Sequence, residues 1–119
     1  NGLPNMLCAE KNGQVIGVVG LELFGRDGFL RSLAIDPEAR GQSLGKQLTE
    51  RILFKARARN LQTVYLLTNT AESYFEKLGF VRIPREAVPE AIQATPEFTQ
   101  LCPGSAVAMK FDIDHSSKN

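Results

Sequence analysis

The segment RGQSLGKQL, residues 40–48, has the composition of a loop that binds a phosphate through its backbone. Gly41 and Gly45 allow a ligand to approach the main chain closely, and an amphipathic stretch that predicts a helix follows at once. A helix N-terminus offers unpaired N–H groups and the positive end of the helix dipole, which together attract anions. The segment therefore predicts a phosphate site at the start of a helix.

Two common phosphate-binding motifs do not match this segment. A P-loop requires GxxxxGK followed by Ser or Thr, whereas three residues separate Gly41 from Gly45, and Gln47 follows Lys46. The dinucleotide fingerprint GxGxxG does not occur in the sequence. The loop is therefore expected to hold the phosphate of another kind of cofactor.

Glu22 is a carboxylate within an otherwise apolar run, residues 15–24. Burial in a strand favours the neutral form of a carboxyl, and a carboxyl tuned in this way can act as a general base. Strand alternation offers a second interpretation, in which Glu22 simply points outward into water. Arg31, in the next predicted strand, could pair with Glu22 or with an anionic substrate.

The elements that would position these residues begin with antiparallel sheet. Asn12 and Gly13, inside a turn at residues 11–14, are typical of a hairpin. The runs on either side of the turn favour strands, so residues 1–24 are predicted to form antiparallel sheet. A second turn at 25–28 leads into a strand at 29–35, along which the side chains are expected to alternate between the two faces. Pro37 cannot continue the ladder and ends this strand.

The second half of the sequence alternates helices and strands. Apolar residues at every fourth position predict a helix over 44–59, with Asn60 suited to a left-handed residue after it. The run TVYLLT, 63–68, predicts a strand buried on both faces. The later expected elements are a helix over 71–79, a strand at 80–83, helical turns at 89–94 and 96–101, and a strand at 106–113.

Composition sets limits on the function. The 119 residues predict one domain, 1–119, and a net charge of +1 argues against a general nucleic-acid binder. No apolar run is long enough to span a membrane, so no membrane partner is expected. Cys8 and Cys102 belong to no CxxC or Cys/His cluster, so neither a metal site nor a disulfide is indicated. The cytoplasm is the expected compartment.

The motifs together resemble the GNAT N-acetyltransferase superfamily. Its pyrophosphate loop has Arg or Gln, two residues, Gly, one residue, then Gly or Ala, and here Arg40, Ser43 and Gly45 take the fixed positions. The segment LAIDPEARG resembles the family's preceding strand and turn, and AESYFEKLGF resembles its later helix and strand. The resemblance covers most of residues 30–80.

The resemblance implies an α+β fold with a mixed, mostly antiparallel sheet flanked by helices, and acetyl-CoA as cofactor without a metal. In this family two neighbouring strands splay apart and the pantetheine arm lies in the gap, where a backbone N–H polarises the thioester carbonyl. The residues that the resemblance assigns to the cofactor are Leu33, Ala34, Ile35, Arg40, Gly41, Gln42, Ser43, Leu44, Gly45, Lys46 and Phe75.

Ser43 and Phe75 depart from the family's pattern. Serine costs about 1 kcal/mol if its position needs a positive φ, but it is also a favoured N-cap whose hydroxyl can bond a phosphate oxygen. Phe75 stands where many relatives carry a tyrosine that protonates the leaving thiolate. Tyr74 or solvent would then supply that proton, although Tyr74 lies about 100° further round the helix and could simply pack. Glu22 and Tyr74 are therefore the candidate catalytic residues.

A narrower resemblance concerns the C-terminal third, PEAIQATPEFTQLCPGSAVAMK. This segment looks like the small bacterial GNAT proteins that are often encoded with arsenic-resistance genes. Cys102 could be read as an arsenic ligand, but a single cysteine before a proline is more often a buried or capping residue.

GNAT domains usually begin with a strand and two helices, whereas this chain opens near the second strand. The expectation is a fold that lacks those elements, either naturally short or a fragment. The function expected is N-acetylation of a small-molecule amine by direct transfer. The alternative is a non-catalytic acyl-CoA-binding or dimer-forming remnant. A homodimer, through the hairpin at 7–24 or the strand at 106–113, would cover the exposed edge.

Overall fold

The computed structural model describes residues 5–35, 44–68, 71–100 and 106–113. These ranges contain a six-stranded sheet in the order β1-β2-β3-β4-β6-β5. The strands are β1 (Asn5–Lys11), β2 (Gln14–Phe24), β3 (Asp27–Ile35), β4 (Thr63–Thr68), β5 (Val81–Ile83) and β6 (Val107–Asp112). The helices are α1 (Leu44–Ala58), α2 (Glu72–Lys77), α3 (Glu90–Gln93) and α4 (Pro96–Gln100), with a 3₁₀ turn, η2, at Arg85–Ala87.

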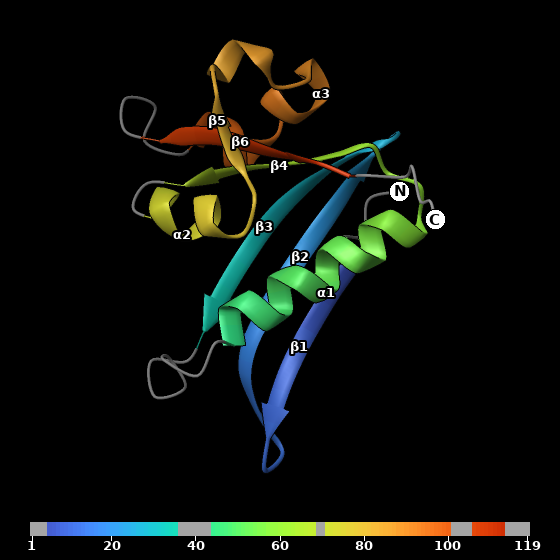
Figure 1. The fold of residues 1–119 in the computed structure, drawn as a ribbon, viewed down its shortest axis with the longest axis vertical. Helices are drawn as coiled ribbons and strands as arrows, with labels where there is room; N and C mark the ends of the chain where they lie inside the picture. Colours follow the sequence, from blue (N-terminus) through green and yellow to red (C-terminus); the bar gives the residue numbers. More distant parts are fainter. Residues whose placement is uncertain (1–4, 36–43, 69–70, 101–105, 114–119) are drawn as a thin grey trace.

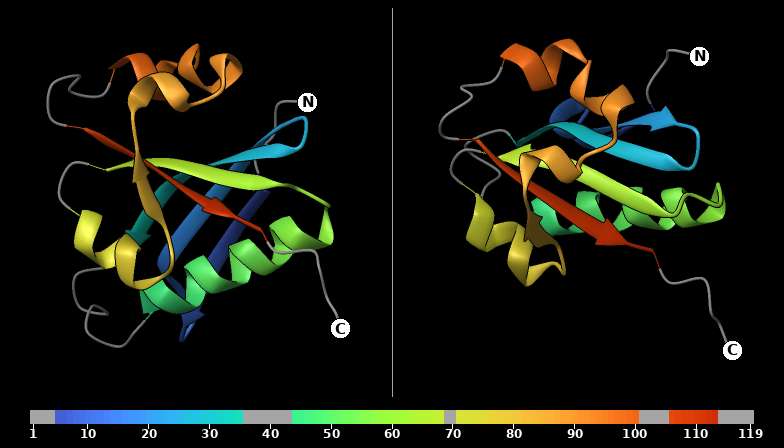
Figure 2. Two further views of the ribbon diagram at one scale, coloured as in Figure 1. Left: turned by 45° about the horizontal axis from the view of Figure 1, so that its top comes forward. Right: turned by 90° about the horizontal axis from the view of Figure 1, so that it is seen from above.

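Helices cover both faces of the sheet, so the molecule has three layers. The long helix α1 and the short helix α2 lie on one face, and the α3 and α4 segment lies on the other (Figures 1 and 2). Every neighbouring strand pair is antiparallel except β3 and β4, which are parallel. The mixed, mostly antiparallel sheet expected from the sequence is confirmed.

The first hairpin forms where the sequence predicts it. Asn12 and Gly13 have φ angles of 55° and 79°, which is the left-handed pair that a type I′ turn needs. The second turn is tighter than expected, because β3 already begins at Asp27 and not at residue 29. Gly25, with a φ of 63°, makes that tight connection possible.

The larger core lies between α1, α2 and the sheet. The buried face of α1 carries Leu48, Ile52 and Ala56, which pack with Val19 and Leu21 of β2. These buried side chains recur at every fourth position, as predicted for this helix. The helix ends at Ala58, and Asn60 adopts the predicted left-handed conformation with a φ of 63°.

A smaller core lies on the opposite face of the sheet. Phe29 of β3 and Ala108 of β6 are buried there against Val88, Ile92 and Phe98, which come from the connection between β5 and β6. Strand β4 lies between the two cores and has both faces covered, as predicted. Its residues 64 and 66 belong to the larger core, and residues 65 and 67 pack against the smaller one.

The connection between β5 and β6 is held on the sheet by a guanidinium. Arg85 of η2 donates a hydrogen bond of 3.1 Å from Nη1 to the carbonyl oxygen of Ala106, and its Cζ lies 4.8 Å from the centre of the Phe98 ring. A cation over an aromatic face is attracted by the ring quadrupole. The two predicted helical turns are present as α3 and α4, whereas η2 was not expected.

Candidate functional site

Strands β3 and β4 separate part-way along their length. They are paired only from Asp27 opposite Thr63 to Phe29 opposite Tyr65. Beyond that point β3 continues through 30–35 and β4 through 66–68, and the two strands diverge in the ribbon (Figure 1). Beyond Phe29 and Tyr65 the two strands are no longer in register, so backbone groups of both strands face the gap. An extended ligand with amide groups could pair with these edges.

A β-bulge lies in β3 beside the gap. Val18 pairs with Ala34 and Gly20 pairs with Arg31, so two residues of β3, 32 and 33, stand opposite Val19 alone. A bulge adds twist and redirects the strand. The uninterrupted alternation expected over 29–35 is therefore wrong at this point.

The helix α1 begins next to the end of β3. Its N-terminus and α2 both lie on the side towards which the strands open (Figures 1 and 2). The first turn of α1 carries no acidic side chain, and Lys46 is exposed in it. Gly45, half-buried in the same turn, adds no side chain. Within this first turn, no acidic side chain opposes the positive potential that an anion would meet at the helix end.

Part of the predicted cofactor site lies outside the described residues. These positions are Arg40, Gly41, Gln42 and Ser43, together with Cys102. For Leu33, Ala34 and Ile35 the structure gives the backbone of β3, which runs along the gap. Leu44, Gly45 and Lys46 form the first turn of α1.

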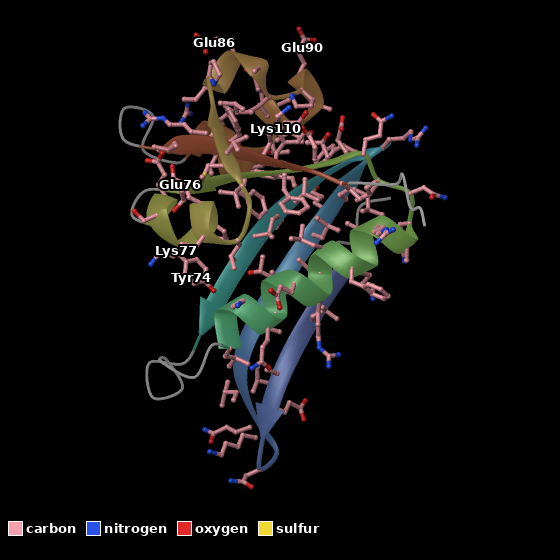
Figure 3. The ribbon with its side chains drawn as sticks, in the orientation of Figure 1. Tyr74, Glu76, Lys77, Glu86, Glu90 and Lys110 are labelled. Atoms are coloured by element: carbon pink, nitrogen blue, oxygen red, sulfur yellow. The ribbon has the colours of Figure 1, made fainter. Side chains whose placement is uncertain are left out.

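The two aromatic residues of α2 contact each other but differ in burial, and their rings lie edge-on with 5.2 Å between centroids. Phe75 is 6% exposed and belongs to the larger core, where its ring lies edge-on to Phe80 with 5.6 Å between centroids. Tyr74 is 36% exposed and lies between α2 and the N-terminal end of α1 (Figure 3). Phe75 is thus packed inside the protein, and Tyr74 is the more exposed of the two residues.

Tyr74 is held in its protonated form. Partial burial raises the pKa of its phenol above the ordinary 10.0, and the negative charge of Glu50 on α1 raises it further. The phenol therefore carries its proton at neutral pH, as a proton donor must. The sequence alone did not indicate the approach of Glu50, because it depends on how α1 and α2 pack.

Glu22 and Arg31 form an ion pair across β2 and β3. Arg31 Nη1 donates a hydrogen bond of 2.7 Å to Glu22 Oε1, and the side chains are 28% and 21% exposed. Glu22 is thus neither fully buried nor directed away into water. The pairing that the sequence allowed is the one observed.

Residues 4–82 match the family model described as "Acetyltransferase (GNAT) domain". The chain belongs to the GNAT acetyltransferase family. This GNAT domain is 37% identical over 84 residues to an "Amino-acid acetyltransferase" of Pseudomonas fluorescens, a match that covers 69% of this chain and 19% of the relative. The chain therefore spans about a fifth of the length of that relative.

Solved structures resemble the GNAT domain in fold. An acetyltransferase of the GNAT family from Staphylococcus aureus superposes with a TM-score of 0.80 at 19% identity, covering 96% of this chain and 71% of the other. An N-acetylglutamate synthase from Neisseria gonorrhoeae, complexed with coenzyme A and N-acetyl-glutamate, gives 0.81 at 20% identity, covering 92% and 26%. At these identities the likeness concerns the fold.

Among the described residues, no helix combines the length and apolar character needed to cross a bilayer.

Proposed function

We propose that this chain is an acetyl-CoA-dependent N-acetyltransferase that acetylates a small-molecule amine by direct transfer. The observation that carries the proposal is the parting of β3 from β4 after Phe29 and Tyr65, next to the bulge in β3 and the N-terminus of α1. These three features bring together an exposed strand edge and an anion site within a domain of the GNAT family.

The residues present fit coenzyme A. The first turn of α1, with Gly45 and Lys46, would hold the pyrophosphate together with Arg40, Gly41, Gln42 and Ser43. The backbone of Leu33, Ala34 and Ile35 would pair with the pantetheine amides, and one of its N–H groups would hold the acetyl carbonyl. When bound, acetyl-CoA supplies an acetyl group activated as a thioester.

Glu22 and Tyr74 are assigned to proton transfer. Glu22 would accept the proton that the amine loses as its nitrogen–carbon bond forms and the carbon–sulfur bond breaks. Tyr74, protonated at neutral pH, would give a proton to the leaving sulfur, with water as the other source. A loss of kcat in Tyr74→Phe at unchanged coenzyme A affinity would support Tyr74 as the proton donor. An unchanged kcat would indicate that water gives the proton.

Release of free thiol from acetyl-CoA, measured with a panel of small amines, tests the proposed activity. The pseudomonad relative is named for amino acids, so amino acids are included in the panel. We expect amine-dependent thiol release, and we expect Glu22→Gln to lower kcat/KM at least tenfold with a flatter pH profile. Glu86→Gln, a change at an exposed glutamate of η2, is the matched control. Coenzyme A binding without thiol release for any amine would establish the binding-only alternative.

We also propose that the protein forms a homodimer through the first hairpin. Within the described sheet, β1 is an edge strand that pairs with β2 alone. On the adjacent surface, Phe54 of α1 is 73% exposed and shares an open groove with Leu7. An apolar surface beside an open strand edge is normally covered.

The strand at 106–113 is less suited to a dimer contact than the sequence indicated. Its residues Ala108, Met109 and Lys110 pair with β4 on one side and with β5 on the other. This interior position leaves no continuous edge for a second copy. Light scattering decides the oligomeric state: we expect twice the chain mass of 13.1 kDa, whereas a stable species of 13.1 kDa would refute the dimer.

A further inference from the structure

Thr49 of α1 carries a fully buried hydroxyl that makes no hydrogen bond to any residue that the structure describes. A helical threonine commonly bonds through its hydroxyl to the carbonyl three or four residues earlier, and Thr49 does not make that bond. A buried polar group without a partner costs free energy. Valine has nearly the same shape and would fill the position without that cost, so packing alone does not favour a threonine here.

Thr95 shows how this fold satisfies a buried hydroxyl elsewhere. Among the described residues it is the other polar side chain that is buried. Its Oγ1 donates a hydrogen bond of 2.7 Å to the carbonyl oxygen of Ile92 and accepts one of 3.3 Å from the backbone N–H of Phe98. The two threonines therefore differ in that Thr95 has its partners within the free protein and Thr49 does not.

Along the helix, Thr49 lies one turn beyond Gly45 on the same face of α1. Residues four apart on a helix lie one above the other, and a helical side chain leans toward the N-terminus. The Thr49 side chain therefore extends toward the first turn, where Gly45 has no side chain of its own. Four residues correspond to about 6 Å along the axis, so the hydroxyl lies just inside the helix end to which the cofactor phosphate is assigned.

Around the helix, Thr49 lies on the side that faces away from β1. Arg51 and Lys55 line a groove together with Leu7 of β1, so their side of α1 faces that strand. At about 100° per residue, Thr49 is about 160° from Arg51 round the helix axis. Because the strand order is β1-β2-β3-β4, the side that carries Thr49 is directed toward the gap between β3 and β4 (Figure 1).

The helices α1 and α2 rest on strands at either side of that gap. The backbone of α1 lies close to β1, β2 and β3, whereas that of α2 lies close to β5. Their boundary therefore lies over the place where β3 and β4 part (Figures 1 and 2). A cofactor arm that leads from the end of α1 into the gap would follow this boundary and pass the side of α1 that carries Thr49.

The surroundings of Thr49 suit a neutral group of the cofactor better than a phosphate. Leu48 and Ile52, its neighbours on the buried face of α1, belong to the larger apolar core. A charge is costly to bury among apolar side chains, whereas an amide with a hydrogen-bond partner is not. The pantetheine arm carries amide groups, and a carbonyl oxygen has two lone pairs. One carbonyl can thus accept from β3 and from a hydroxyl together.

We infer that Thr49 is a further cofactor-binding residue, whose hydroxyl donates a hydrogen bond to an amide carbonyl oxygen of the pantetheine arm. This inference rests on the proposed acetyltransferase function, because it places a residue against the cofactor of that reaction. The hydroxyl then has its role in the complex, so its removal should weaken binding of the ligand without destabilising the free protein.

Calorimetric titration of Thr49→Val and Thr49→Ser tests the inference. The valine removes the hydroxyl at nearly constant shape, and the serine keeps it. Each variant is titrated with coenzyme A and with ADP, which has a pyrophosphate but no pantetheine arm. Thermal unfolding without ligand gives the Tm of each variant. The matched control is Thr99→Val, which removes an exposed hydroxyl from α4 on the opposite face of the sheet.

We expect Thr49→Val to bind coenzyme A about threefold to tenfold more weakly, which is the effect of one neutral hydrogen bond. Its affinity for ADP should stay at the wild-type value, and Thr49→Ser should keep most of the affinity for coenzyme A. The control Thr99→Val should bind as the wild type does. The Tm of Thr49→Val should be unchanged or higher, whereas Thr95→Val, which loses two hydrogen bonds, should have a lower Tm.

Three results would overturn the assignment of Thr49. One is an unchanged affinity of Thr49→Val for coenzyme A, and another is an equal loss of affinity for ADP, which would place the effect at the phosphate. The third is an equal loss in Thr49→Ser, which would show that shape and not the hydroxyl matters. A wild type that binds no coenzyme A would instead refute the proposed function itself, so the two failures are distinguishable.

Discussion

Phe29 and Tyr65 are the last residues at which β3 and β4 pair, and each strand continues beyond them without the other. The ring of Phe29 is buried in the smaller core, and Tyr65 packs at the border of the same core. The point of divergence is thus fixed by packing on the face opposite α1. The packing of Phe29 and Tyr65 keeps the two strands paired up to this point, and the gap begins directly after it.

Hydrogen exchange measures whether the gap receives the cofactor. The register between β3 and β4 ends at Phe29, so backbone amides of 30–35 that face the gap should exchange faster than those of 27–29. Saturating coenzyme A should slow exchange in 30–35 and leave the hairpin turn at Asn12 and Gly13 unchanged. Equal exchange in 30–35 with and without coenzyme A would contradict pairing of the ligand with β3.

The phenol of Tyr74 should titrate above its ordinary pKa of 10.0, because burial and the charge of Glu50 both favour the neutral form. The protein has two tyrosines, so a Tyr65→Phe background leaves Tyr74 as the single phenol for ultraviolet titration. Adding Glu50→Gln should lower the midpoint. A midpoint that does not respond to Glu50→Gln would show that the two side chains are not close in solution.

The raised pKa of Tyr74 also determines how the free energy of unfolding changes with pH. A group whose pKa is raised by folding contributes stability that is complete below the unfolded pKa of about 10 and is lost as pH rises through the folded value. Unfolding free energy should therefore fall above pH 10, and less steeply in Tyr74→Phe.

Gly79 should be far less tolerant of substitution than Gly25. Both have positive φ, 107° and 63°, but an added Cβ at Gly79 would lie 2.8 Å from Cε2 of Phe111, whereas the space around Gly25 is open. Gly25→Ala should cost about 1 kcal/mol of unfolding free energy, and Gly79→Ala about 2–4 kcal/mol because strain and overpacking add. Chemical denaturation measures both, and equal losses would show that Phe111 moves aside freely.

Features with a local cause could be predicted from the sequence. The turn at Asn12 and Gly13 follows from two residues that tolerate positive φ, and α1 follows from apolar side chains at every fourth position. The burial of β4 on both faces follows from an unbroken β-branched and aromatic run. Each of these depends on neighbouring residues alone.

Features that depend on packing could not be predicted in the same way. The place where β3 leaves β4 is decided by Phe29 and by residues of the β5–β6 connection, some sixty positions later in the chain. The orientation of α2, which buries Phe75 and brings Tyr74 towards Glu50, is set by contacts with α1 and the sheet. Both features depend on residues that are far apart in the sequence and meet only in the folded protein.

Calorimetric titration of Gly45→Val with coenzyme A tests whether the N-terminus of α1 holds the cofactor. Gly45 lies in the first turn of α1, where a branched side chain would block approach to the backbone while the rest of the helix keeps its core contacts. Leu53→Val, a change in a later turn of the same helix, is the control. We expect binding by the wild type and by the control, and at least a hundredfold loss of affinity in folded Gly45→Val. Unchanged affinity in Gly45→Val would contradict a cofactor site at this helix end.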